Sequence, residues 1–161
     1  MSFDAPSDLN IRGAGLRFGI VAARFNTGLV DGLRSRAVAV LAAAGVRAKD
    51  IVEIRVPGSH EVPWAAQQLA ATGRFDCVIA LGVLIGGDTN HHEMVGESVS
   101  HALQQVALGT GVPVINGVIV TDTLAQARAR CVGKLDRGAE FARAGLEMAA
   151  LRRTLRKGKH S

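Results

Sequence analysis

The sequence has 161 residues, of which 48% are hydrophobic and 20% are charged, and its formal net charge is +5. This length and composition predict one globular domain with a buried core and exclude an intrinsically disordered chain. No apolar run approaches the roughly 18 residues that a membrane-spanning helix needs. The polar, acidic start MSFDAPSDLN does not resemble a secretory signal, so we expect a cytoplasmic protein without a membrane partner.

The positive charge is concentrated at the carboxyl end of the chain. Five of the 19 Lys and Arg residues lie within 152–161, which contain no acid, while the other 14 are balanced by 14 Asp and Glu residues. Because the basicity belongs to a short tail and not to a domain face, it favours a solvated tail over a weak attraction to RNA. We therefore expect no nucleic-acid partner.

The first half of the chain alternates between strand and helix. Residues 1–15 are polar, contain two glycines and are predicted to form an arm. The apolar run at 16–23 predicts a buried strand, and 28–44 predicts a helix that keeps its apolar residues on one face. A strand at 51–56 leads into a helix at 61–72, whose first turn tolerates the proline found there.

The second half continues the alternation. The run CVIALGV at 77–83 predicts the third strand, and apolar residues at helical spacing between Val95 and Val106 predict a helix after it. The run PVINGVIV at 113–120 predicts the fourth strand. Two further helices are expected near 123–130 and at 137–155.

Strands that alternate with helices form right-handed βαβ units, which build a parallel sheet covered on both faces. We therefore predict a three-layer α/β/α sandwich with a four-stranded parallel sheet, of the flavodoxin-like class. A single domain at 16–155 is followed by the tail at 156–161. Such sheets bind ligands beyond the carboxyl ends of their strands. The loops at that edge are 24–26, 57–61, 86–92 and 121–123.

The loop after the third strand has two interpretations. The glycines at 86–87 let backbone N–H groups turn towards a ligand, and Thr89 adds a hydroxyl just before a helix, which together predict an anion cradle. A plain turn with a capping box between Asn90 and Glu93 is the alternative. The carboxylate of Asp88 would repel a phosphate unless it points to solvent.

His91 and His92 begin the following helix. Histidine is the usual proton carrier near neutral pH, and a helix N-terminus favours the neutral ring that accepts a proton. An exposed histidine without a role is the alternative, and we prefer it for His92. A zinc site from His60, His91 and His92 is disfavoured, because adjacent histidines rarely ligate one metal. Cys77 and Cys131 lack metal spacing and are interpreted as buried, reduced thiols.

Several side chains near these loops have two interpretations. Phe25 either stacks on a planar heterocycle or tucks back under its loop, whereas Trp64 is expected in the core. Glu61 is either a charge at a helix start or a carboxylate that faces a ligand. Arg130 and Lys134 lie between the last two helices, where a cation could reach a phosphate or be solvated.

The loops lie within five longer segments: FGIVAARFN, VPGSHEVPWAA, VIALGVLIGGDTNHHEMV, TGVPVINGVIVTDT and KLDRGAEFARAGLEMAALRRTL. In this order and separation the segments resemble the lumazine synthase family, and the resemblance covers residues 16–155. The middle three segments are the specific ones, since a lone G-x-T-x-H pattern would not suffice.

The resemblance implies a transferase of riboflavin biosynthesis that condenses 5-amino-6-(D-ribitylamino)uracil with 3,4-dihydroxy-2-butanone 4-phosphate. The products are 6,7-dimethyl-8-ribityllumazine, phosphate and water, and no metal or organic cofactor is implied. It also implies a homo-oligomer, as a pentamer, a decamer or an icosahedral capsid of sixty subunits, with active sites at subunit interfaces. The amino-terminal arm of such proteins commonly adds a strand to a neighbour's sheet.

The resemblance also assigns roles to residues. Phe25 stacks on the pyrimidine ring, and His91 transfers protons. Arg130 grips the phosphate within its own subunit, whereas Asn116 comes from a neighbouring subunit. The other implied substrate contacts are Ser59, His60, Glu61, Val83, Ile85, Gly87, Asp88 and Thr89, of which the last three form the phosphate cradle.

A few positions depart from the family pattern. Gly86 stands where a cation is usual, His60 where an aromatic or apolar residue is common, and Asn116 where Phe is common. The changes at Gly86 and His60 support the alternative of a non-catalytic paralogue that binds flavin or serves as an assembled shell. The related archaeal type of riboflavin synthase is a second alternative. The G-x-T-x-H loop at 87–91 and Arg130 favour lumazine synthase over this riboflavin synthase.

Overall fold

A computed structural model describes residues 4–159 of the chain. One sheet contains the strands β1 (Phe18–Ala23), β2 (Ile51–Val56), β3 (Cys77–Ile85) and β4 (Val114–Thr121), in the order β2-β1-β3-β4. All three neighbouring pairs are parallel, because a helix returns the chain between successive strands. The predicted parallel sheet is therefore confirmed.

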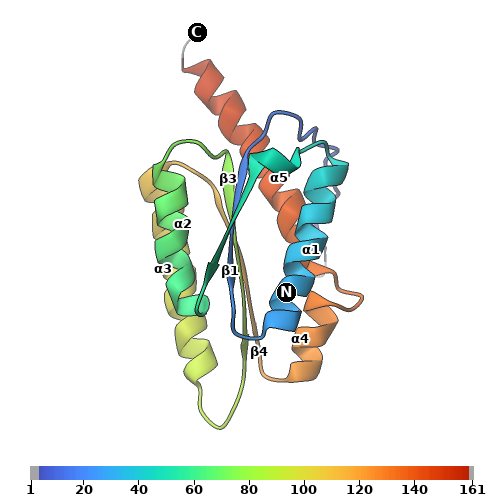
Figure 1. The fold of residues 1–161 in the computed structure, drawn as a ribbon, viewed down its shortest axis with the longest axis vertical. Coiled ribbons are helices and arrows are strands. Elements are labelled where there is room, and N and C mark those ends of the chain that lie inside the picture. Colours follow the sequence, from blue (N-terminus) through green and yellow to red (C-terminus); the bar gives the residue numbers. More distant parts are fainter. Residues whose placement is uncertain (1–3, 160–161) are drawn as a thin grey trace.

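Helices cover both faces of this sheet, which gives the predicted three layers (Figure 1). One face carries α2 (Val62–Ala71) and α3 (His91–Thr110). The other carries α1 (Thr27–Ala43), α4 (Leu124–Cys131) and α5 (Arg137–Gly158). Two short 3₁₀ turns, η1 (Ala48–Asp50) and η2 (Ser59–Glu61), flank β2.

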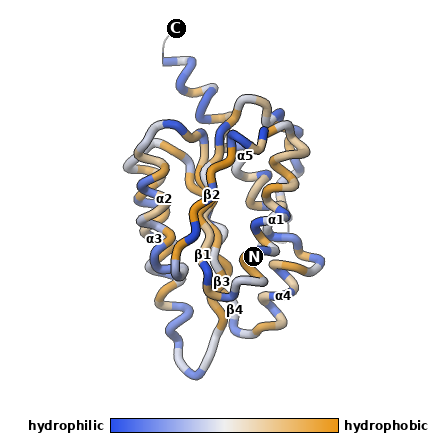
Figure 2. The backbone as a smooth tube through the Cα atoms, in the orientation of Figure 1, coloured by the Kyte–Doolittle hydropathy of each residue, from blue (hydrophilic) through white to orange (hydrophobic). Residues whose placement is uncertain are grey.

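The sheet separates two hydrophobic cores. Successive side chains of β1 point to opposite faces, so Phe18, Ile20 and Ala22 pack with α1 and α5, whereas Val21 and Ala23 pack with α2 and α3. All six residues of β1 are buried, and Figure 2 shows the hydrophobic strands between helices of alternating hydropathy. Burial on both faces explains why the strand sequences are nearly continuous apolar runs.

The last helix is longer than the sequence predicts. It ends at Gly158, not at residue 155, so the first three residues of the predicted tail are helical. This end projects beyond the amino-terminal edge of the sheet (Figure 1). The last two residues of the predicted tail lie outside the described part.

The arm before β1 packs on its own chain. Residues 5–13 form neither helix nor strand, and the Asp8 carboxylate lies 3.4 Å from Nε of Arg143 on α5. Addition of the arm to a neighbour's sheet therefore stays a prediction.

One core prediction is wrong and one is confirmed. Trp64 is 69% exposed, because α2 buries Val62, Ala65, Ala66 and Leu69 and position 64 falls off that face. Cys77 and Cys131 are buried and unpaired, as predicted. No helix within residues 4–159 is long and apolar enough to cross a membrane.

Candidate active site

A cleft of about 470 Å³ opens at the carboxyl-terminal edge of the sheet. Four segments that are far apart in the sequence form its walls: the β1–α1 loop, η2, the end of β3 and the start of α3. Its lining residues are Phe25, Asn26, Gly58, Ser59, His60, Glu61, Val83, Leu84, Ile85, Gly87, Thr89, His91, His92 and Val95. Three of the four loops predicted from the sequence therefore meet in one place.

Phe25 stands at the mouth of this cleft with its ring 70% exposed. One edge of the ring is packed on Gly58, where an added Cβ would lie 3.2 Å from Cδ2 of Phe25. The interpretation in which the ring tucks under its own loop is therefore wrong. The exposed ring can stack on a planar ligand.

Asn26 fixes the loop that carries this ring. Its backbone is left-handed, with φ of 56°, a conformation that Asn tolerates better than most residues. Its Nδ2 donates a hydrogen bond to the carbonyl oxygen of Val83, 2.9 Å away. The β1–α1 loop is thus tied to the end of β3, and both sides of the cleft are held in a fixed relation.

Of the two interpretations of Glu61, the structure supports a carboxylate at a helix start. Glu61 Oε2 accepts a hydrogen bond from the Gly58 backbone N–H at 2.9 Å, and the Glu61 backbone N–H donates to the Gly58 backbone oxygen at 3.2 Å. Ser59 is buried and packs on Gly82, where an added Cβ would lie 2.4 Å from the Ser59 hydroxyl. His60 is exposed and lines the cleft, so its imidazole is available to a ligand bound there.

The loop between β3 and α3 forms the lowest point of the molecule in Figure 1. Gly86 lies so close to the next loop that an added Cβ would be 2.7 Å from the backbone oxygen of Asp122. Gly87, in contrast, faces open space. Asp88 is exposed and does not line the cleft.

The predicted capping box at the start of α3 is not formed. Asn90 is the N-cap residue but makes no side-chain cap hydrogen bond. Its backbone oxygen accepts from Glu93 and Met94 instead. The Thr89 hydroxyl accepts from the His91 backbone N–H at 3.4 Å. The positive end of a 20-residue helix therefore points into the cleft with a hydroxyl beside it, which suits an anion.

The two adjacent histidines have different surroundings. His91 is exposed and lines the cleft. The side chain of His92 is only 11% exposed and its Nε2 lies 3.3 Å from Asp122 Oδ1, so the expectation of a solvent-exposed His92 is wrong. Nδ1 of His92 is buried without a hydrogen-bond partner, which favours the tautomer that donates from Nε2.

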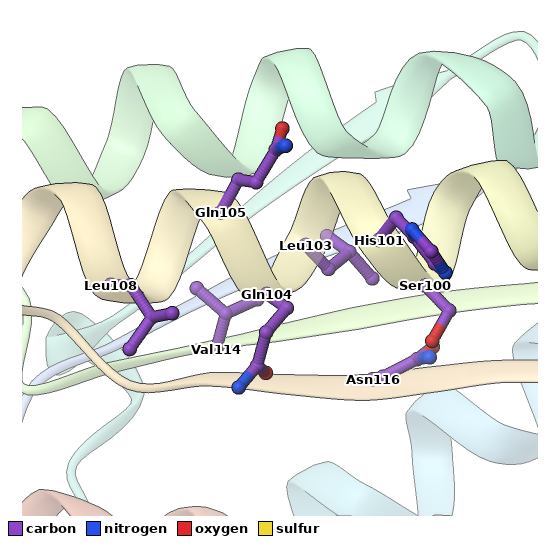
Figure 3. A pocket seen from close by; sticks show the side chains of 8 residues that line it. All are labelled: Ser100, His101, Leu103, Gln104, Gln105, Leu108, Val114 and Asn116. Atoms are coloured by element: carbon purple, nitrogen blue, oxygen red, sulfur yellow. The ribbon is translucent and has the colours of Figure 1, made fainter.

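Asn116 and Arg130 lie away from the cleft of their own chain. Asn116, on the edge strand β4, faces Ser100 of α3 in a separate groove (Figure 3). Arg130 is on α4, on the other face of the sheet (Figure 1), and its Nη1 donates to the backbone oxygen of Gln126 at 3.0 Å. Arg130 therefore does not line the cleft of its own chain, and its contact with a phosphate stays a prediction.

The zinc site considered from the sequence is replaced by another set of side chains. Within residues 4–159, the group close enough to share an ion is His92, Glu93 and Asp122, not the three histidines. The burial of both cysteines raises their thiol pKa values, so neither is a ready nucleophile. Sequence reasoning gave no role to Asn26, although Asn in a short loop between a strand and a helix is a recognisable signal for a left-handed turn.

Comparison with known proteins adds to this geometry. A family model described as 6,7-dimethyl-8-ribityllumazine synthase matches residues 15–153. Relatives with that name include those of Nitrosospira multiformis (44% identity; 91% of this chain and 89% of the relative) and Ralstonia nicotianae (43%; 88% and 85%). An archaeal relative of the same name, from Thermococcus gammatolerans, is 43% identical over 89% of this chain and 92% of its own.

Proposed function

The chain belongs to the 6,7-dimethyl-8-ribityllumazine synthase family, and from that membership we propose that the cleft is its active site. The protein is a transferase of riboflavin biosynthesis. Its reaction condenses 5-amino-6-(D-ribitylamino)uracil with 3,4-dihydroxy-2-butanone 4-phosphate and releases 6,7-dimethyl-8-ribityllumazine, phosphate and water.

One observation carries the assignment of the site: a flat ring, a helix N-terminus and an exposed histidine line the same cleft. The pyrimidine stacks on Phe25, which is exposed at the mouth. The phosphate lies at the start of α3, beside Gly87 and Thr89, where helical N–H groups favour an anion. His91, the first residue of α3, lines the same cleft as Phe25, Gly87 and Thr89.

The chemistry follows from this placement. The pyrimidine amine attacks the ketone and water leaves as the imine forms. A proton is then removed from the neighbouring carbon and the phosphate departs. The enol left behind becomes a ketone, and the second amine attacks that carbonyl and closes the ring with loss of a second water. His91 accepts and returns these protons, a role that suits a histidine at a helix N-terminus, where the macrodipole favours the neutral ring. Holding both substrates together supplies much of the remaining rate.

We propose that Asn116 and Arg130 act in the cleft of a neighbouring copy. Both lie outside their own cleft, and a phosphate dianion needs a cation, whereas no Lys or Arg lines this cleft. An arginine from a second subunit meets that need with bidentate hydrogen bonds. The protein is accordingly a homo-oligomer, as a pentamer, a decamer or a sixty-subunit shell, which native mass measurement distinguishes.

The function is tested with the purified protein and both substrates. We expect the fluorescence of the lumazine product to rise with release of one phosphate per product, and no signal when either substrate is omitted. Failure to form product at saturating substrate, with riboflavin still bound, would identify a flavin-binding paralogue. Formation of riboflavin from lumazine alone, without phosphate release, would identify a riboflavin synthase.

A further inference from the structure

Three potential metal ligands meet beside the cleft, where the start of α3 contacts the β4–α4 turn. One ligand atom from each of His92, Glu93 and Asp122 lies within 4.8 Å of the other two. We propose that these side chains bind one divalent transition-metal ion, with Zn²⁺ as the reference ion. This site goes beyond the proposed function, since the lumazine reaction implies no metal.

The ligand chemistry fits such an ion. Imidazole binds Zn²⁺ and its neighbours in the periodic table, and two carboxylates complete a neutral set around a dication. Two tetrahedral ligands, each about 2.0–2.1 Å from Zn²⁺, lie roughly 3.3 Å apart. That is the separation between His92 Nε2 and Asp122 Oδ1, which is 3.3 Å. The same pair makes only a long hydrogen bond without a metal.

The backbone around the cluster holds two of the ligands in place. Gly86 N donates to the Thr121 oxygen at 2.8 Å, and the close contact of Gly86 with Asp122 leaves no room for a Cβ. Asp122 N donates to Gln126 Oε1 at 2.9 Å. His92 is fixed by burial, with its side chain 11% exposed. The exposed carboxylates of Glu93 and Asp122 can rotate onto an ion without disturbing the core.

The surroundings also limit the affinity. When Nε2 of His92 binds a metal, the ring proton must lie on Nδ1, which is buried without a partner. Strong metal sites give that proton an acceptor, and loss of such an outer partner costs 10–100-fold in affinity. We therefore expect a dissociation constant in the micromolar range, weaker than that of a structural zinc site.

Metal binding itself is the test. The full chain is freed of metal with a chelator and titrated with Zn²⁺ in a calorimeter. We expect one ion per chain whose affinity falls at least about tenfold in Asp122→Asn and in Glu93→Gln. Gly86→Ala keeps every ligand but displaces Asp122, so it should also weaken binding. His101→Gln is the matched control, because it removes an exposed histidine of α3 that lines a different groove.

A structural loss is separated from a loss of ligand by thermal unfolding. Asp122→Asn, Glu93→Gln and His101→Gln should melt within a few degrees of wild type without metal, and Zn²⁺ should raise the wild-type Tm but not that of Asp122→Asn. The proposal is overturned if Zn²⁺ does not bind, or if Asp122→Asn and Glu93→Gln bind it as wild type does. Binding that is lost in His91→Gln and retained in Asp122→Asn would place the ion inside the cleft and equally overturn it.

Discussion

The two edges of the sheet differ in whether their functional side chains are buried and paired or exposed. At the amino-terminal edge, Asp76 is buried and accepts hydrogen bonds from the Arg17 backbone and from two nitrogens of Arg153. At the carboxyl-terminal edge, Phe25 and His91 are exposed and a helix N-terminus opens onto solvent. Paired charges stabilise the first edge, and unpaired groups make the second available to a ligand.

Asp76→Asn should cause the largest effect, and on stability alone. The substitution removes a buried charge that links α5 to the start of the sheet. It also places an amide NH₂ group, itself a donor, next to the N–H donors of Arg17 and Arg153. The side chain of Arg153 is 42% exposed, and a hydrogen bond to a charged group contributes about 1.5–3 kcal/mol, so the loss of several such bonds should cost about 3 kcal/mol. Urea unfolding followed by circular dichroism should show this loss, while kcat of the folded fraction stays at the wild-type value.

The matched variant at the other edge is Asp88→Asn, which changes an exposed carboxylate outside the cleft. Its unfolding free energy should change by less than about 0.5 kcal/mol. Equal destabilisation by the two variants would contradict the division of roles between the edges.

His91→Ala should have the reverse effect. Loss of a general acid–base group should slow kcat on the order of 10²-fold, whereas the exposed side chain contributes little to folding. The measurement is steady-state lumazine formation together with urea unfolding. His101→Ala, on the same helix, should leave both quantities unchanged. An unaltered kcat in His91→Ala would remove this residue from proton transfer.

Much of this architecture could be predicted from the sequence because it depends on local patterns. Alternating apolar runs predicted each strand within about two residues of its observed bounds. The main extension is at β3, which includes the partly buried Leu84 and Ile85. Trp64 was misplaced because hydrophobicity alone does not say which side of a helix faces the core.

The parts of the site that could not be predicted depend on contacts between distant segments. The side chain of His92 is paired with Asp122, 30 residues away, and a pair of adjacent histidines in the sequence gives no sign of this contact. Arg130 was expected in its own cleft because the family resemblance implied it. The crossover after β4 instead carries α4 to the opposite face of the sheet, which separates the arginine from the cleft.

Arg130→Ala should have an intermediate effect, on substrate binding. It tests whether the site at the carboxyl-terminal edge includes a residue of a neighbouring subunit. A charged hydrogen bond contributes about 1.5–3 kcal/mol, so KM for the butanone phosphate should rise tenfold or more. KM for the pyrimidine should stay constant in initial-rate measurements. An equal rise of both constants would indicate a damaged fold.

Mixed assemblies identify the source of the arginine. Co-assembled Arg130→Ala and His91→Ala chains should regain activity, because some sites combine an intact His91 with an intact Arg130 from the neighbour. If each chain used its own Arg130, no site in the mixture would be intact and no activity would return.

The smallest effect should appear in alkaline solution, away from the cleft. Burial raises the pKa of Cys131 to about 11, an increase that nearby Arg130 and Arg36 only partly oppose. Burial and the charge of Asp76 raise the pKa of Cys77 as well. Both thiols therefore have a higher pKa in the folded protein than in the unfolded chain. Their contribution to stability is fully present below about pH 8.5, the ordinary cysteine pKa.

This contribution should be lost as the pH rises from about 9 towards 11, because the unfolded chain then releases thiol protons that the folded chain retains. The sequence contains no tyrosine, so no phenol titrates in the same range. Urea unfolding at pH 8 and pH 10 should show a smaller pH dependence in Cys131→Ala than in wild type. The cleft contains neither cysteine, so kcat of the folded enzyme should not follow this titration. A kcat that falls with the thiols in wild type but not in Cys131→Ala would link the two regions that the structure keeps apart.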